Sequence, residues 1–267
     1  MTKYYCRICN FRSNRKYRLN DHIKQNHNFT YTTEYNGRFC NQIFRNIVVN
    51  FIAEKWNLYV NYSNYDKIKS LGIDLFIGEK KYNKFKKLSE KNFFDFFSKE
   101  IKFNLNANED FYQTFNISNK IYDYLNSTYV KDNIINKNEF KKRYKNNNDI
   151  FIHIRLGDVE KFNPGIDFYL KCISMLKFDN IFIASDDLNN KIIKLILNKY
   201  PSSILIDYNE VKTIKFGSTC KNIILSQGTF SAIIGYLGFY SNVFYPNLKK
   251  KFCGDIFSIK DWTCVKK

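Results

Sequence analysis

The chain has 267 residues, of which 44% are hydrophobic and 18% aromatic, and this apolar content excludes an intrinsically disordered protein. Its 43 lysines and arginines against 25 aspartates and glutamates give a net charge of +18, which fits a nucleic acid, a membrane surface or a phosphorylated ligand as partner. Lys, Asn, Ile, Tyr and Phe are all abundant, and because their codons are rich in A and T, genome composition can account for part of the lysine excess.

No segment predicts export or membrane insertion. The N-terminus, MTKYYCRICNF, lacks the apolar core of a signal peptide. The longest apolar stretch, residues 223–245, is interrupted by Ser226, Gln227, Gly228 and Asn242, whereas a membrane span needs an unbroken run of about 18 residues. The seven cysteines are therefore expected to be reduced or metal-bound, and we predict a cytoplasmic protein without membrane contact.

Residues 1–30 predict a C2H2 zinc finger. The pattern C-x2-C-x12-H-x4-H supplies two thiolates and two imidazoles at the spacing that suits a structural zinc ion. Two of the three histidines in the chain fall in this pattern. The alternative is an incidental tail rich in cysteine and histidine. The four predicted zinc ligands are Cys6, Cys9, His22 and His27.

The finger also bears on nucleic-acid binding. In the frame of a classical finger, the positions that face the bases are Arg15, Arg18 and Asp21. A single finger covers about three base pairs, which is too few for specific recognition. We therefore expect a weak nucleic-acid or protein contact through the finger, with a small structural cap as the alternative.

A polar loop and a helix follow the finger. The loop, residues 36–42, contains Gly37, Arg38 and Asn41, and apolar residues recur at helical spacing from 43 to 56. A loop that enters a helix in this way presents backbone N–H groups to a phosphate or another anion. A plain helix start with capping and turn residues is the alternative.

The loop and helix open a first lobe, which we place at residues 31–148. Its patterns predict strands at 58–62 and 73–77, and helices at 66–71, 108–125 and 138–144. Residues 79–148 carry no motif whose chemistry we can interpret.

The most informative stretch is Asp149–Asp158, DIFIHIRLGD. An apolar run that ends in Arg155 predicts a buried strand opening into a polar loop. Ligands of open α/β sheets bind at the carboxyl ends of the strands, and an arginine placed there suits a phosphate. The alternative is that Arg155 pairs with Asp158 and holds a turn.

Strands and helices alternate through a second lobe, residues 149–267. Alternation in such short units predicts parallel strands in a doubly wound α/β fold. The carboxyl ends of its strands then bring Arg155, the Asp186–Asp187 pair and residues 226–231 to one edge. The predicted strands are 181–185, 203–207, 222–225 and 242–245, and the predicted helices are 167–176, 189–200 and 229–240.

The residues of this edge suit a nucleotide. Asp186 and Asp187 offer carboxylates to a purine or a ribose, although Asp187 also suits a helix N-cap. Gly228 permits close approach of a ligand, and the helix that starts at Thr229–Ser231 faces an anion. His153 lies two residues before the arginine on the same strand face and is a further candidate, with a hydrogen-bonded core histidine as the alternative.

Three separated segments together resemble one family. They are GRFCNQIFRN (37–46), HIRLGD (153–158) with ASDD (184–187), and SQGTFSAIIGYLGFYSNVFYP (226–246). As an ordered set, these motifs resemble the α-1,2-fucosyltransferases of glycosyltransferase family 11, and they are similar to α-1,6- and protein O-fucosyltransferases. The resemblance covers residues 37–262.

The resemblance implies a GT-B arrangement of two Rossmann-like lobes, with the acceptor side at residues 31–148 and the nucleotide-sugar donor side at 149–267. It also implies GDP-fucose as donor, a glycan hydroxyl as acceptor, inversion at the anomeric carbon and no catalytic metal. The expected reaction is therefore an inverting fucosyl transfer, with an α-1,2 linkage as the first expectation.

The resemblance also implies roles for single residues. Arg155 matches the arginine that holds the β-phosphate and stabilises the departing GDP, and Asn41 matches an asparagine that faces the sugar phosphate. The acceptor proton needs a base, for which Asp158, Glu160 and Asp167 are candidates. The predicted catalytic residues are Arg155, Asp158 and Asn41, and the predicted donor-binding residues are Gly37, Arg38, His153, Arg155, Asp186, Asp187, Ser226, Gly228, Thr229, Phe230 and Ser231.

Two positions depart from the family pattern. Cys40 replaces the second glycine of G-x-G-N-Q, and Leu156 replaces the second of two adjacent arginines. These departures leave another linkage, or another nucleotide-sugar, open. A rival hypothesis of a different class is a nucleic-acid-binding zinc-finger protein whose α/β body is not catalytic.

Overall fold

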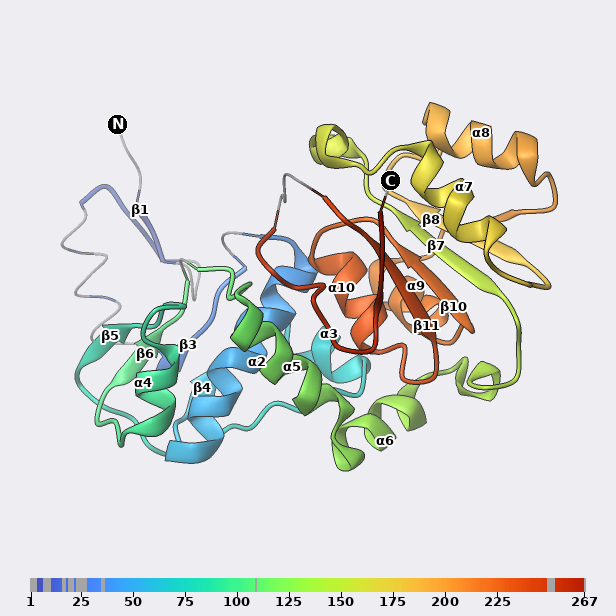
Figure 1. Cartoon of the computed structure of the whole chain (residues 1–267). Coiled ribbons are helices and arrows are strands. Elements are labelled where there is room, and N and C mark those ends of the chain that lie inside the picture. Colours follow the sequence, from blue (N-terminus) through green and yellow to red (C-terminus); the bar gives the residue numbers. More distant parts are fainter. Residues whose placement is uncertain are drawn as a thin grey trace. The chain divides into compact units, whose positions relative to one another are not determined.

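The computed structural model describes residues 4–6, 11–15, 18, 22, 28–34, 37–108, 110–248 and 253–266. These residues form an α/β protein with two parallel sheets, of four and six strands, and a two-stranded antiparallel hairpin (Figure 1). The chain divides into two compact units, Met1–Lys69 with Asp74–Gln113 and Ser70–Ile73 with Thr114–Lys267. The predicted parallel α/β character is thus confirmed.

The boundary between the units differs from the predicted one after residue 148. Residues 114–148 belong to the second unit because their side chains bond to its later segments. The ring of Tyr122 lies 5.6 Å from that of Tyr236, and Asn138 Nδ2 donates to the carbonyl oxygen of Lys215 at 2.8 Å. These two contacts join segments 114 and 77 residues apart, so the local pattern does not reveal them.

Strands β1 (Tyr4–Tyr5) and β2 (Arg12–Ser13) form the hairpin near the N-terminus. The N–H of Cys6 donates to the carbonyl oxygen of Phe11 at 2.8 Å, and the ring of Phe11 stacks on that of His22 with centroids 4.0 Å apart. Two predicted ligands, Cys9 and His27, lie outside the described residues. Within the described residues, no group of three or more His, Cys, Asp or Glu side chains could hold a metal ion, and the four-ligand zinc site stays a prediction.

The first unit is built on a four-stranded parallel sheet in the order β4-β3-β6-β5. The helix predicted from the 43–56 pattern is confirmed as α2, whose side chains Ile43, Phe44, Ile47 and Ile52 are fully buried. The elements are β3 (Thr30–Tyr31), α2 (Phe39–Trp56), β4 (Val60–Asn61), α3 (Tyr65–Ser70), β5 (Phe85–Lys87), α4 (Phe93–Ser98) and β6 (Asn104–Asn106).

Among the described residues, every helix is too short or too polar to span a lipid bilayer.

The strand predicted at residues 73–77 is wrong, because this described segment pairs with no strand. Side chains bond its backbone instead. Asn50 Oδ1 accepts from the N–H of Phe76 at 2.6 Å, and the hydroxyl of Tyr62 donates to the carbonyl oxygen of Phe76 at 3.0 Å. Ile73 and Leu75 are buried while Phe76 and Ile77 are exposed, so an apolar run can pack part of its side chains without joining a sheet.

The second unit is built on a six-stranded parallel sheet in the order β12-β11-β10-β7-β8-β9. The strands are β7 (Ile150–Ile154), β8 (Ile181–Ser185), β9 (Ile204–Leu205), β10 (Asn222–Leu225), β11 (Asn242–Pro246) and β12 (Thr263–Val265). The helices are α5 (Phe115–Asn126), α6 (Thr128–Lys137), α7 (Ile166–Ser174), α8 (Lys191–Lys199), α9 (Glu210–Gly217) and α10 (Thr229–Tyr236), with short 3-10 helices η1 (Lys141–Arg143) and η2 (Gly157–Phe162).

Most predicted elements of this unit are confirmed, and the failures lie in its polar segments. The strands at 181–185 and 222–225 have the predicted bounds. The helix predicted at 108–125 begins only at Phe115, and the one predicted at 138–144 is the three-residue η1. Helices α6 and α9 and strand β12 were not predicted.

Both faces of the sheet in the second unit are covered, which explains the continuous apolar run of β7. Ile150, Ile152 and Ile154 pack in one cluster with residues of α7 and α8. On the opposite face, the ring of Phe151 lies 6.3 Å from that of Phe216 of α9, and His153 bonds to Ser231 of α10. Successive side chains of the strand therefore enter two separate layers.

The strand order reverses between β7 and β10. From β7 the chain adds β8 and then β9 on one side, and it returns to place β10 and then β11 on the other. In open α/β sheets, the crevice at such a reversal, outside the carboxyl ends of the strands, is the usual ligand site. The predicted site residues that follow β7 and β10 flank this point.

Candidate functional site

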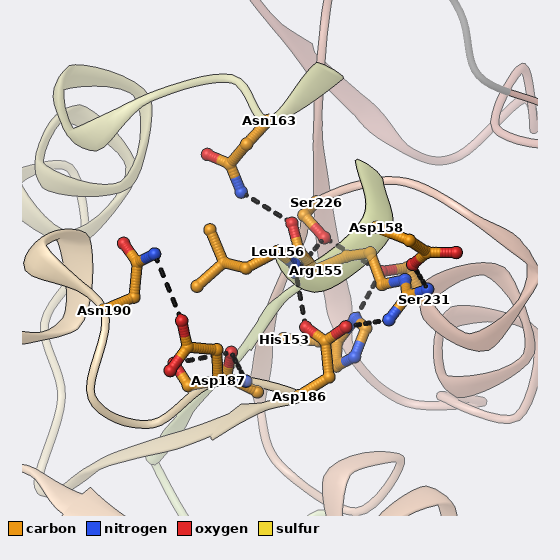
Figure 2. A network of polar contacts seen from close by, with 11 residues as sticks. His153, Arg155, Leu156, Asp158, Asn163, Asp186, Asp187, Asn190, Ser226 and Ser231 are labelled. Atoms are coloured by element: carbon orange, nitrogen blue, oxygen red, sulfur yellow. Dashed lines mark hydrogen bonds and ion pairs between the residues drawn. The ribbon is translucent and has the colours of Figure 1, made fainter. Parts of the chain in front are cut away.

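The candidate site lies at the carboxyl ends of β7, β8 and β10. His153 pairs with Ala184 and Leu225 in the sheet, and Ile154 pairs with Ser185. Arg155, Asp186 and Ser226 therefore directly follow the ends of three neighbouring strands, side by side along the edge of the sheet. The structure brings these residues together, as the sequence predicts (Figure 2).

Arg155 is held by two carboxylates. Its Nη1 bonds to Asp186 Oδ2 and its Nη2 to Asp158 Oδ1, and Figure 2 shows the guanidinium bonded to both. The Arg155 side chain is 13% exposed, against 27% for Asp186 and 58% for Asp158. The alternative in which Arg155 pairs with Asp158 and holds a turn is thus present in the structure. A phosphate that binds Arg155 has to replace at least one carboxylate.

The two carboxylates differ in how firmly they are held. Asp186 Oδ1 also accepts the N–H of Leu156 at 2.8 Å, so the aspartate fixes the turn after β7. Gly157 has φ +37°, and a Cβ there would lie 2.6 Å from Asp186 Oδ2, so a side chain at this position would collide with the carboxylate. Asp158 belongs to the short η2 and is mostly exposed. Asp158 is therefore the partner that exchanges more readily.

Asp187 binds the loop that precedes α8. Its Oδ1 accepts the N–H of Asn189 at 3.1 Å, and its Oδ2 accepts from Asn190 Nδ2 at 3.4 Å. The N-cap of α8 is Asn190, whose side chain accepts the N–H of Ile192. Asp187 is therefore not the N-cap of α8, which was the alternative to a ligand-binding role. Its side chain instead holds the turn that precedes the N-cap, Asn190.

A buried polar network lies behind Arg155. His153 Nδ1 lies 2.6 Å from Ser231 Oγ, and Ser226 Oγ accepts the N–H of Arg155 at 2.9 Å. The two serine hydroxyls are 3.4 Å apart and fully buried. Burial, and after it the charge of Arg155, lowers the pKa of His153 to about 3, so its imidazole is neutral at physiological pH. His153 is a hydrogen-bonded core histidine, the alternative that the sequence left open.

The N-terminus of α10 forms the opposite side of the site. Gly228 precedes the helix with φ +89°, and apart from its two chain neighbours no described residue has an atom within 4 Å of the position that a Cβ would take. Thr229 is the first helical residue, and Phe230 lies with its ring 4.9 Å from that of His153. The first turn of a helix has N–H groups without helical partners and carries a partial positive charge. An anion can approach the backbone here.

The predicted residues of the first unit form a loop that is braced from within. Gly37 has φ +112°, and a Cβ there would lie 2.6 Å from Cβ of Asn41. Arg38 is the N-cap residue of α2. Asn41 Oδ1 accepts from Gln113 Nε2 at 3.0 Å, and Gln42 Nε2 donates to the carbonyl oxygen of Gly37 at 3.2 Å. The loop therefore has a defined conformation, and Gln113, which no sequence pattern singled out, helps to set it.

Asn163 was not predicted near the second-unit site, and Gln227 was placed at its edge within residues 226–231 but was given no role. Asn163 Nδ2 donates to the carbonyl oxygen of Arg155 and to the hydroxyl of Tyr169, both at 2.9 Å, and so orients the arginine backbone. Gln227 is 2% exposed, between Ser226 and Gly228. Neither amide stands in a pattern that distinguishes it from a loop residue.

Comparison with known proteins gives no further support. The chain matches no protein-family model and no curated protein. The case for a function therefore rests on the geometry and on the order of the motifs.

Proposed function

We propose that the protein is an inverting glycosyltransferase that moves fucose from GDP-fucose to a hydroxyl of a glycan acceptor, with the two units acting as Rossmann-like lobes of a GT-B fold. One observation carries this proposal. Arg155 and the N-terminus of α10 leave adjacent strands at the point where the strand order reverses. Such a point is where α/β folds bind nucleotides.

The diphosphate would lie between Arg155 and the start of α10. The guanidinium supplies a charged fork, and the helix supplies N–H groups beside Gly228, where the backbone is open. The incoming phosphate replaces the exposed Asp158, while Asp186 keeps the guanidinium oriented. His153 and Ser231 are buried and bonded to each other, so they support the strand and helix that carry the site rather than contact the diphosphate.

Catalysis then follows from charge stabilisation. The acceptor oxygen attacks the anomeric carbon of fucose, and the bond from that carbon to the diphosphate oxygen breaks with its electron pair leaving on GDP. Arg155 stabilises the charge that develops on the diphosphate. A carboxylate takes the acceptor proton, and Asp158, once displaced from Arg155, is the candidate nearest to the arginine. The resemblance assigns Asn41, with Gly37 and Arg38, to the sugar phosphate.

The test is a ligand panel on the full chain. Thermal unfolding is measured with GDP, UDP, GDP-fucose and GDP-mannose, followed by turnover of GDP-fucose in the presence of glycan acceptors. We expect GDP and GDP-fucose to raise the Tm, since a ligand that binds the folded state stabilises it. A Tm that no guanine nucleotide raises contradicts the proposal. If UDP raises the Tm and GDP does not, the donor is a UDP-sugar, and the proposed reaction class, glycosyl transfer, is unchanged.

A second candidate function is nucleic-acid binding through the predicted zinc finger. The exposed side chains of Arg12, Arg15 and Arg18 and the net charge of +18 favour it. It predicts an affinity for nucleic acid that falls steeply with salt and that depends on Cys6 and His22. Zinc analysis of the purified protein tests the finger separately.

A further inference from the structure

A small cavity opens at the carboxyl ends of β10 and β11. Its lining includes Ser226, Gln227, Tyr245 and Phe257, and its volume is about 30 Å³. A cavity needs about 10–15 Å³ to hold one water, so this one has room for about two groups of that size.

Gln227 gives the cavity its chemistry. Its side chain is 2% exposed, and neither Oε1 nor Nε2 has a hydrogen-bond partner among the described residues. A buried polar group without a partner is destabilising, and native structures keep few of them. Both amide atoms are buried, so a ligand or water in the cavity that Gln227 lines supplies these bonds when the side chain turns toward it.

The ligand that fits is neutral and polar. The side chains described around the cavity are all uncharged, and burial raises the pKa of Tyr245 to about 12, which keeps its hydroxyl protonated. An amide offers one acceptor and two donor hydrogens side by side. Hydroxyl groups both donate and accept, so two hydroxyls of one sugar ring satisfy both amide atoms, whereas a phosphate satisfies the donors alone.

The position of the cavity indicates which hydroxyls these are. Ser226, one of its lining residues, accepts the N–H of Arg155, and Gly228 adjoins it on the other side of Gln227. The cavity therefore borders the proposed diphosphate site. A sugar nucleotide carries hydroxyl-bearing rings at both ends of its diphosphate, namely the transferred sugar and the ribose.

We propose that Gln227 binds sugar hydroxyls of the nucleotide-sugar, and that the cavity is their subsite. Tyr245 and Phe257, whose rings stack with centroids 5.9 Å apart, line the same cavity, whose volume suits the two hydroxyl groups rather than the whole sugar ring. This inference rests on the proposed function, and it gives a role in specificity to a residue of the third motif that had none.

The experiment measures the binding of three probes to the full chain by calorimetry: inorganic pyrophosphate, GDP and GDP-fucose. In Gln227→Leu, we expect GDP-fucose to bind about tenfold more weakly, because two hydrogen bonds are lost, while pyrophosphate binds as before. Loss of affinity for GDP-fucose alone assigns the transferred sugar to the cavity. An equal loss for GDP assigns the ribose.

Controls separate binding from folding. Leucine at position 227 removes the unpaired amide, so the Tm without ligand should be unchanged or higher than in the wild type. Asn242→Leu also replaces an amide with leucine, at an exposed position at the amino end of β11 that bonds to Asn222, and it should leave all three affinities unchanged. Should Gln227→Leu not fold, Gln227→Met keeps the length of the side chain and serves in its place.

Three results would overturn the inference. Unchanged binding of all three probes shows that the cavity holds water alone. An equal loss for pyrophosphate shows that the substitution distorts the diphosphate site. Failure of the wild type to bind any probe contradicts the proposed function as well, which distinguishes that outcome from the first two.

Discussion

The sheet of the second unit carries an arginine–carboxylate cluster at each end. At the amino end, Arg143 Nη2 bonds to Asp149 Oδ2 at 2.8 Å, and Asp149 Oδ1 accepts from Asn180 at 2.8 Å. At the carboxyl end, Arg155 bonds to Asp158 and Asp186. The first cluster lies just before β7 and β8, and the second lies just after the same two strands. Closeness in sequence to a strand therefore does not show which cluster binds a ligand.

Their surroundings do distinguish them. The guanidinium of Arg143 lies over the ring of Phe216 at 4.5 Å, its Nε donates to Thr219, and its partner Asp149 is 5% exposed. The backbone N–H of Arg155 bonds to Ser226, two residues before Gly228, and its partner Asp158 is 58% exposed. Arg143 itself is 26% exposed, so the first cluster is distinguished by its buried aspartate, whereas the second has an aspartate that solvent or a ligand can replace. We infer a structural role for Arg143 and a binding role for Arg155.

The sharpest test is Arg155→Ala. We expect GDP-fucose turnover to fall about 10²–10³-fold, because one stabilising contact to the developing charge is lost. The free energy of unfolding should fall by less than about 1 kcal/mol, since the carboxylates left behind are partly solvated. Turnover is measured on folded protein, with the denaturant midpoint as the check of folding. Turnover close to that of the wild type would show that Arg155 does not contact the diphosphate.

Arg143→Ala should give the opposite result. It leaves Asp149 buried without its charged partner, so we expect the free energy of unfolding to fall by about 2–3 kcal/mol, somewhat less than for a fully buried pair. Urea denaturation measures this loss. The folded fraction should bind GDP with wild-type affinity. A large loss of GDP affinity with little loss of stability would reverse the roles assigned to the two arginines.

The fold of the second unit was predictable because its central strands are buried on both faces of the sheet. β7, β8 and β10 are continuous apolar runs because helices cover both sides of the sheet, so the sequence reveals them directly. α9 was missed because its burial rests on a few side chains such as Ile214 and Phe216, in a segment that also carries Glu210 and two lysines. β12 has three residues, and its pairing with β11 depends on tertiary structure.

The site was predictable in location but not in bonding. Arg155, Asp186 and residues 226–231 could be placed at one edge because parallel strands end together there. The ion pair between Arg155 and Asp186 depends on the turn at Gly157, which no local pattern specifies. The unpaired amide of Gln227 depends on what surrounds it, and that information is tertiary.

The hydrogen-bond network of His153, Ser226 and Ser231 is neutral, unlike the charged cluster around Arg155. The pH dependence of the protein's stability tests this difference. The pKa of His153 is about 3 in the folded protein, against about 6.5 when unfolded. Between these values the unfolded chain takes up a proton that the folded protein does not, so the stability is fully present above the unfolded pKa and declines as the pH falls toward 3. His153→Asn should reduce the loss of unfolding free energy between pH 7 and pH 5 by about 2 kcal/mol, measured by urea denaturation. An unchanged pH dependence would contradict a buried neutral imidazole.

The smallest expected effect tests whether Asp158 is the exchangeable partner of Arg155. Asp158→Asn removes a carboxylate that competes with phosphate, and because an exposed ion pair contributes up to about 1 kcal/mol, pyrophosphate and GDP should bind up to about fivefold more tightly. Asp179→Asn removes the same charge from an exposed position before β8, and it should change neither affinity. If Asp158 also accepts the acceptor proton, turnover falls in the same variant in which binding improves. Weaker binding of both ligands would mean that Asp158 orients Arg155 for the phosphate rather than yielding to it.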